Sequence, residues 1–272
     1  MPFGLVGNMC ARDLTVHKIK ETYKFLSQTD DLSPNNDGVN ACLTDFVSSL
    51  CDLQDSADAD IILQLDEIAA ELDALPDLCG QAECEMEKFW AKKLINDPDI
   101  KNDGVKKFWY FEHYKNLCMA ENDLANIGHF ENISFLGCGA LPLTAYFASI
   151  HSPDAKIKCI DFDCTACGLA WDLMKALDLT DRIEIINDKA VDYKPAKNEL
   201  VICASLLSGR LDMYKQLVRN GVKTMMVRDA EGMYQFLYKP AEKPDLPFVE
   251  IGKTTPTRER INTTLLYTAH EG

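Results

Sequence analysis

The spacing of hydrophobic residues divides the chain into two parts with different periodicities. From Leu14 to about Glu121, apolar residues recur at intervals of three and four with acidic residues between them. This spacing is typical of amphipathic helices, so we predict that the first part of the chain is all-α. The expected helices include residues 61–72, 76–95 and 108–122.

After Gly128, short runs of hydrophobic and often β-branched residues alternate with helical stretches. The predicted strands are 133–137, 156–161, 183–187, 200–204, 224–227 and 263–268, and the predicted helices between them are 143–149, 167–177 and 211–220. Such alternation is typical of a mostly parallel sheet that helices cover on both faces. We therefore predict an α/β fold, with a helical domain at 1–125 and a Rossmann-like domain at 126–272.

Composition narrows the kinds of partner that this chain can bind. The 272 residues are 47% hydrophobic, which is enough for a packed core, and 43 acidic against 28 basic side chains give a net charge of −15. Nucleic acids and anionic membranes both require a positive protein surface, so this charge argues against them. No apolar run approaches the roughly 20 residues of a membrane-spanning helix. The partners are predicted to be small molecules, and the sequence leaves the oligomeric state open.

Cysteine usage indicates a reducing environment. The chain has 11 cysteines, an odd number, and its first residues lack the basic and long apolar stretches of a secretory signal peptide. Free thiols in the cytoplasm are therefore expected. Cys164 and Cys167 form a C-x-x-C motif, but no second pair stands at metal-ligand spacing, so we predict no metal site.

The strongest local motif is the segment ISFLGCGALPLT at residues 133–144, where a predicted strand runs through Gly-x-Gly into a helix. Glycines allow a tight turn and let a ligand approach the backbone closely. An ordinary strand–helix turn is the alternative, because the loop lacks the third glycine of the dinucleotide fingerprint. The residues of this loop that we expect at a ligand are Gly137, Gly139, Leu141, Pro142 and Thr144.

Acidic residues follow the next strands. Asp161 ends the second strand, about 20 residues after Gly139, where a Rossmann-like fold places the carboxylate that binds ribose hydroxyls. Asp163, two residues later, is interpreted instead as a cap of the next helix. Asp188 follows the third strand and Ala204 ends the fourth, so both are expected at the ligand-binding edge, although Asp188 in a solvated loop is an equal alternative. The set resembles class I S-adenosylmethionine-binding domains and favours an adenosine-containing ligand without a pyrophosphate.

Three further segments make the resemblance more specific. They are LCGQAECEME at 78–87, FWYFEHYKNL at 108–117 and VRDAEGMYQFLY at 227–238. With the loop at 137–144, they resemble the nicotianamine synthases and the related opine-metallophore synthases of bacteria and archaea. The resemblance spans about residues 78–267 and implies a helical domain packed over a Rossmann-like domain. It also implies that S-adenosylmethionine is a substrate, and that no metal is needed.

The implied reaction moves the 3-amino-3-carboxypropyl group of S-adenosylmethionine to an amino nitrogen and releases 5′-methylthioadenosine. The product would be nicotianamine or a related metallophore. The alternatives are an ordinary methyltransferase that acts on a small molecule, and a non-catalytic member of the fold that only binds a ligand or a protein. The nucleoside product separates the first two, because a methyltransferase releases S-adenosylhomocysteine.

Two pairs of side chains suit this chemistry. Glu83 and Glu87 are spaced i, i+4 and share a helix face, where a carboxylate could accept a proton from the attacking amine. The resemblance favours Glu87 over Glu83, and a solvated acidic face is the alternative. Tyr110 and Tyr114 have the same spacing, and the resemblance implies that a hydroxyl, preferably that of Tyr114, holds the amine or the methionine carboxylate. Aromatic core packing is the alternative for both tyrosines.

Arg228 ends the fifth predicted strand, on the ligand side of the sheet. A guanidinium can pair bidentately with a carboxylate, so Arg228 is the candidate for binding a substrate carboxylate. A structural salt bridge is the alternative.

Overall fold

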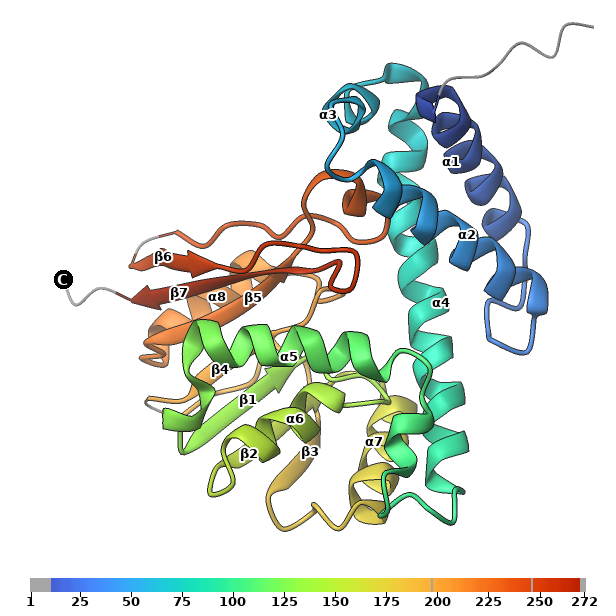
Figure 1. Ribbon diagram of the computed structural model, residues 1–272. Helices are drawn as coiled ribbons and strands as arrows, with labels where there is room; N and C mark the ends of the chain where they lie inside the picture. Colours follow the sequence, from blue (N-terminus) through green and yellow to red (C-terminus); the bar gives the residue numbers. More distant parts are fainter. Residues whose placement is uncertain (1–10, 197, 246, 270–272) are drawn as a thin grey trace, which may run out of the picture.

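The computed structural model describes residues 11–196, 198–245 and 247–269, and it contains a group of helices beside a seven-stranded sheet (Figure 1). The first helices are α1 (Ala11–Ser27), α2 (Asp37–Leu53), α3 (Asp58–Leu63), α4 (Ala69–Ile95) and α5 (Phe111–Ala125). The long helix α4 packs against α1 near its start and against α7 further along, so it connects the helical group to the sheet region. No helix in the described ranges has the length and hydrophobicity that crossing a membrane requires.

The sheet has the strand order β3-β2-β1-β4-β5-β7-β6. Its strands are β1 (Asn132–Leu136), β2 (Lys156–Asp161), β3 (Ile183–Asn187), β4 (Leu200–Cys203), β5 (Thr224–Asp229), β6 (Phe248–Lys253) and β7 (Thr263–Ala269). The first five are parallel, and β7 lies antiparallel between β5 and β6. The helices α6 (Leu143–His151), α7 (Cys164–Ala176) and α8 (Arg210–Arg219) connect the strands. The predicted α/β fold is confirmed, and the strand order reverses at β1 and β4, where ligands of such sheets bind.

Local sequence explains most of these elements. All four residues of β4 are buried, as expected for a central strand between two helical layers. Helix α7 begins where Asp163 accepts hydrogen bonds from the backbone N–H groups of Thr165 and Ala166, at 2.8 and 3.2 Å. The capping role considered for Asp163 is therefore confirmed, because a side-chain oxygen satisfies N–H groups that have no partner within the helix.

Several predicted boundaries are wrong. The continuous helix expected over 61–72 is broken, because α3 ends at Leu63 and a 3-10 turn, Asp66–Ile68, precedes α4. Pro76 lies inside α4 instead of near its start. The helix expected from residue 108 begins at Phe111. Strand β6 was missed because only its first residue is buried, so it shows no apolar run.

Two hydrophobic cores join the halves of the chain. One packs Leu94 of α4 and Phe111 of α5 with Phe135 of β1. Another packs helices α1 to α4 with Met233 and Phe236, which follow β5. Residues on both sides of position 125 thus share a core, and the division into domains at that position stays a prediction.

Helix α5 is fastened to the sheet by a buried ion pair between Glu121 and Arg228. Arg228 Nε and Nη2 donate to the two Glu121 oxygens at 2.8 and 2.9 Å, and both residues are almost fully buried. Thr264 donates its hydroxyl to Glu121 Oε1, and Thr144 accepts a hydrogen bond from Arg228 Nη2, both at 2.8 Å. The ion pair therefore connects α5, β5, β7 and the start of α6.

We predict that Glu121→Gln lowers the free energy of unfolding by about 3–5 kcal/mol, because it leaves the Arg228 charge buried without a counter-ion. Urea denaturation followed by circular dichroism measures this loss. The matched control is Glu112→Gln on the same helix, which removes an exposed ion pair with Lys115 and should cost less than about 1 kcal/mol. Equal losses in the two variants would contradict the prediction.

Candidate functional site

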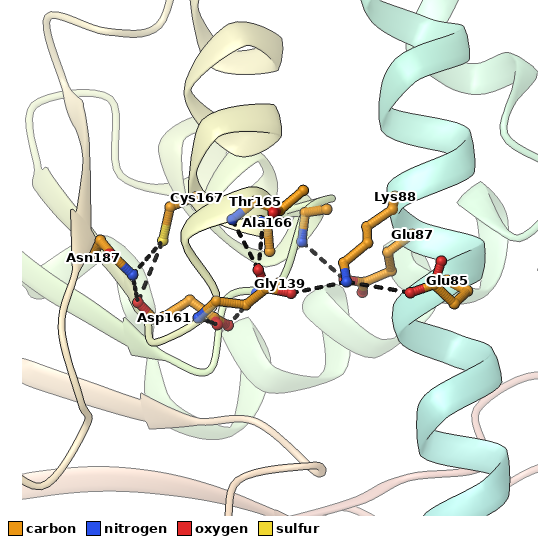
Figure 2. Close-up of polar contacts among 11 residues, drawn as sticks. Glu85, Glu87, Lys88, Gly139, Asp161, Thr165, Ala166, Cys167 and Asn187 are labelled. Carbon is orange, nitrogen blue, oxygen red and sulfur yellow. Dashed lines mark hydrogen bonds and ion pairs between the residues drawn. The ribbon is translucent and has the colours of Figure 1, made fainter.

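Two side chains of α4, Glu87 and Lys88, reach across to the segments that follow β1 and β2 (Figure 2). Glu87 Oε1 accepts a hydrogen bond from the Tyr114 hydroxyl at 3.1 Å. Glu87 Oε2 accepts one from the backbone N–H of Ala140 at 3.2 Å. One carboxylate therefore contacts α5 and the loop after β1 at the same time.

The glycines of this loop have the conformations that their positions require. Gly139 has φ +62°, and a Cβ there would overlap Glu87 Oε2. Gly137 has φ +77°, and a Cβ there would lie 3.2 Å from the Cβ of Ala204. A side chain at either position would be strained, and at Gly139 it would also displace Glu87.

Asp161 holds the turn of the same loop. Its Oδ2 accepts a hydrogen bond from the Gly139 N–H at 2.8 Å, and its Oδ1 accepts one from the Asp163 N–H at 2.9 Å. A carboxylate has about four lone-pair positions, so two backbone bonds leave capacity for ligand hydroxyls.

Lys88 ties α4 to the start of α7. Its ammonium lies 2.8 Å from Asp163 Oδ2 and 3.3 Å from Glu85 Oε1 (Figure 2). Asp163 also caps α7. Its carboxylate therefore holds both the start of α7 and Lys88, the residue next to Glu87. Lys88 could not be recognised from the sequence, because no local spacing links it to Asp163.

The electrostatics of the site are dominated by two neighbouring carboxyl groups. Burial is the main cause that raises the pKa of Glu87 to about 8, and the charge of Glu83 adds to it, although the hydrogen bonds from Tyr114 and Ala140 oppose the shift. Burial also raises the pKa of Glu83, against the effects of Tyr238 and Arg228. Both side chains are still partly exposed, so these perturbed acids are accessible. A strongly raised carboxyl pKa is typical of general acid–base sites.

The tyrosines combine packing with polar contact. Tyr110 stacks on His113 with ring centroids 4.3 Å apart, and its ring meets that of Tyr114 edge-on. Burial raises the pKa of both tyrosines, so both remain hydroxyl donors. Aromatic packing is therefore shown for these rings, and the Tyr114 hydroxyl in addition donates to Glu87. Tyr238, which faces Glu83, was missed although it lies in one of the segments that carried the resemblance.

The other predicted ligand residues lie around this site with fewer polar contacts. Asp188 is exposed beside Asp161, and its carboxylate accepts from the backbone N–H of Lys189. Ala204 lies next to Gly137, with its N–H bonded to the carbonyl of Leu136. Three loop residues are buried, namely Leu141, Pro142 and Thr144. For all of these, ligand contact stays a prediction.

Arg228 forms a structural salt bridge, which was the alternative to binding a substrate carboxylate. Its Nε and Nη2 are occupied by Glu121, and Nη2 also bonds Thr144. A substrate carboxylate could pair bidentately with Nε and Nη2 only if it displaced Glu121. Otherwise it would have to approach Nη1.

Within the described part of the chain, no group of three or more His, Cys, Asp or Glu side chains is arranged to hold a metal ion. The ten cysteines that the structure describes are free thiols, and Cys10 lies outside the described residues.

Comparisons with known proteins agree with this geometry. The family described as "Nicotianamine synthase protein" matches residues 8–271. Nicotianamine synthase of Solanum lycopersicum is 29% identical over 268 residues, which is 92% of this chain and 82% of the relative. The L-histidine 2-aminobutanoyltransferase of Yersinia pestis is 27% identical over 154 residues, 56% of this chain and 55% of the relative.

Solved structures share the fold. MtNAS in complex with MTA and tNA has a TM-score of 0.82 and 19% identity, and the alignment covers 97% of this chain and all of the other. A mutant of MtNAS in complex with S-adenosylmethionine has a TM-score of 0.80 and 20% identity, with 94% and 98% covered.

We predict that stability depends on pH through Glu87. Because its pKa in the fold lies above the usual 4.5, the folded state holds an extra proton between pH 4.5 and about 8. This contribution is present in full below pH 4.5 and is lost as the pH rises through 8. Glu87→Gln is neutral at every pH. Above pH 8 its free energy of unfolding should therefore exceed that of the wild type by on the order of 1–3 kcal/mol, allowing for the partial exposure of this side chain.

Urea denaturation at pH 5 and pH 9 measures this difference. Glu85→Gln, an exposed change on the same helix, is the control. A Glu87→Gln advantage that does not grow between the two pH values would show that Glu87 has an ordinary pKa.

Proposed function

The chain belongs to the nicotianamine synthase family, and we propose that the side chains around Glu87 perform its reaction. The enzyme is an S-adenosylmethionine-dependent aminocarboxypropyltransferase. It moves the 3-amino-3-carboxypropyl group to an amino nitrogen and releases 5′-methylthioadenosine. The observation that carries the assignment of the site is the position of Glu87, a carboxyl with a raised pKa that contacts the glycine loop.

The donor site consists of the glycine loop and Asp161. In the proposal, Asp161 accepts hydrogen bonds from the ribose hydroxyls, and the loop from Gly137 to Thr144 passes close to the methionine and sulfonium part. The closeness of Gly139 to Glu87 supports this arrangement, because a sulfonium bound beside the loop would be within reach of α4. Asp188 and Ala204 flank the adenosine on the neighbouring strands.

Glu87 is proposed as the general base. An attacking amine must lose a proton, and a carboxylate of ordinary pKa is too weak a base to take it from an ammonium group. A pKa of about 8 brings Glu87 close to the range of amines, which is the condition for efficient proton transfer near neutral pH. Tyr114 orients the Glu87 carboxylate by its hydrogen bond.

The chemical step is a displacement at carbon. The amine lone pair attacks the γ-carbon of the methionine chain and forms the new C–N bond. The C–S bond breaks, and its electron pair neutralises the sulfonium to give the thioether of 5′-methylthioadenosine. The amine proton passes to Glu87. All three carbons on the sulfonium are electrophilic, so the carbon held in line with the amine decides the reaction.

Glu83 and Tyr110 are proposed to hold the acceptor. Glu83 is one helical turn away from Glu87 on α4, and the ring of Tyr110 meets that of Tyr114 edge-on. An acidic surrounding suits a protonated amine before it reacts. Arg228 acts mainly by holding α5 in place through Glu121, and its Nη1 is the group left for a substrate carboxylate.

We infer that the product is nicotianamine or a close relative, and not a histidine adduct. The match to the tomato nicotianamine synthase covers 92% of this chain, whereas the match to the Yersinia enzyme covers 56%.

The free thiols support a reducing, cytoplasmic location.

The decisive experiment incubates the pure enzyme with S-adenosylmethionine alone, and then with amino acids, and identifies the products by mass. We expect 5′-methylthioadenosine together with a product built of aminocarboxypropyl units. S-adenosylhomocysteine without methylthioadenosine would replace this proposal with methyl transfer. Binding without turnover for every acceptor would favour the non-catalytic alternative.

We predict that Glu87→Gln lowers kcat by about 100-fold or more, because the amide cannot accept the amine proton. Its affinity for S-adenosylmethionine, measured by calorimetry, should change less than about threefold, since no donor contact is removed. In the wild type, kcat should rise with pH through about 8, as the Glu87 base is deprotonated. Full activity of Glu87→Gln would remove Glu87 from the mechanism.

Asp161→Ala, in contrast to Glu87→Gln, is predicted to weaken the binding of S-adenosylmethionine. Loss of charged hydrogen bonds to two ribose hydroxyls costs about 1.5–3 kcal/mol each, so binding of S-adenosylmethionine should weaken by at least about 100-fold. Titration of the variant by calorimetry measures this loss. Wild-type affinity in Asp161→Ala would exclude it as the ribose acid.

A further inference from the structure

Arg210 is a buried cation that the proposed reaction does not use. It is the first residue of α8 and is only 4% exposed. Its guanidinium donates to four backbone carbonyls, those of Ala204, Ser205, Leu207 and Arg228, at 3.0, 2.6, 2.9 and 3.1 Å. No carboxylate in the described ranges forms an ion pair with it.

Stability alone does not favour a charge at this place. A buried cation loses its hydration, and carbonyl oxygens replace that hydration only if they are held in the right geometry. A positive charge at the start of a helix is also opposed by the helix dipole. The arrangement does one thing that a neutral side chain of similar size could not do: it gathers the carbonyls at the ends of β4 and β5 around one planar group.

The backbone that Arg210 gathers is the exit turn of β4, residues 204–207. Ala204 and Leu207 both lie against Gly137, where a Cβ would meet them at 3.2 and 3.4 Å. On the other side, Leu206 packs against Gly80 of α4 so closely that a Cβ on Gly80 would lie 2.9 Å from it. The Ser205 hydroxyl accepts a hydrogen bond from Asn262 at 2.8 Å.

The exit turn therefore contacts the glycine loop on one side and α4 on the other, although Leu206 itself is 40% exposed. Gly80 precedes Glu83 by about one helical turn and Glu87 by about two, so Leu206 touches the same face of the helix that carries both acids. A shift of the exit turn would change the distance between the glycine loop and Glu87.

We propose that Arg210 is a positioning residue for the transfer reaction, because it fixes the exit turn that sets the γ-carbon in line with the acceptor amine. The inference rests on the proposed function. If the turn loosens, water can take the place of the amine. The oxygen of water then attacks the γ-carbon, the C–S bond breaks with its electron pair going to sulfur, and a proton is released. The products are 5′-methylthioadenosine and homoserine.

The test compares Arg210→Lys and Arg210→Gln with the wild type. Lysine keeps the charge but lacks the planar set of donors, and glutamine lacks both. We expect the KM for S-adenosylmethionine to rise about 5–10-fold in Arg210→Lys and further in Arg210→Gln, because small misplacements have large effects on such steps. We also expect the molar ratio of methylthioadenosine to transfer product to rise at least about threefold, with homoserine as the extra product.

Arg219→Lys is the matched control, since Arg219 is exposed at the other end of α8 and should behave as the wild type. Lower melting temperatures together with a wild-type KM and product ratio would overturn the inference and leave Arg210 a purely structural residue. If the Arg210 variants do not fold, Leu206→Ala tests the same turn without touching the charge. An unchanged product ratio in Leu206→Ala would then overturn the inference.

This design separates the two hypotheses. If the wild type releases no methylthioadenosine, the proposed function itself fails. If the wild type turns over normally and the variants match it, only the role of Arg210 fails.

Discussion

The buried ion pair between Glu121 and Arg228 is the constraint on which the site depends. It joins a helix that precedes the sheet to the interior strand β5, and two threonine hydroxyls complete the bonding of both partners. Glu121 lies about two helical turns after Tyr114 on α5, so the position of the tyrosine hydroxyl is set by the depth at which Glu121 is held. Two charges taken out of water stabilise a fold little, but they allow very few alternative arrangements of the groups attached to them. The ion pair therefore contributes more to fixing the position of α5 than to the free energy of unfolding.

The pKa of Glu87 likewise depends on how several elements of the fold are held together. Its burial raises the proton affinity, whereas the hydrogen bonds from Tyr114 and Ala140 limit the increase. Each of the three elements around it supplies one contribution: α4 supplies the carboxyl, α5 a hydroxyl donor and the glycine loop a backbone donor. The basicity of the group is therefore a property of the assembled fold and not of any one segment.

The sequence predicted the fold class well and the details of the site less evenly. The strands β1 to β5 were found because buried parallel strands are continuous apolar runs, whereas β6 has only one buried residue and leaves no such signal. Glycine positions at 137 and 139 and the spacing of Glu83 and Glu87 are local patterns, so they could be recognised directly. The contacts of Arg228 with Glu121 and of Lys88 with Asp163 join residues that lie far apart in the chain, and no local pattern encodes them. The role expected of Arg228 was uncertain for that reason, since a buried arginine and a ligand-binding arginine look the same in sequence.

The place of β7 between β5 and β6 has a consequence for how the protein is made on the ribosome. Thr264, which bonds Glu121, and Asn262, which bonds Ser205, both come after nearly all of the residues that they support. The core of helices α1 to α4 likewise includes Met233 and Phe236, so the helices synthesised first cannot complete their core until these later residues have followed. Domains that fold one after another during synthesis are the usual case for chains of this size. Here the first helices keep part of their hydrophobic surface uncovered until residues 233–261 have been synthesised.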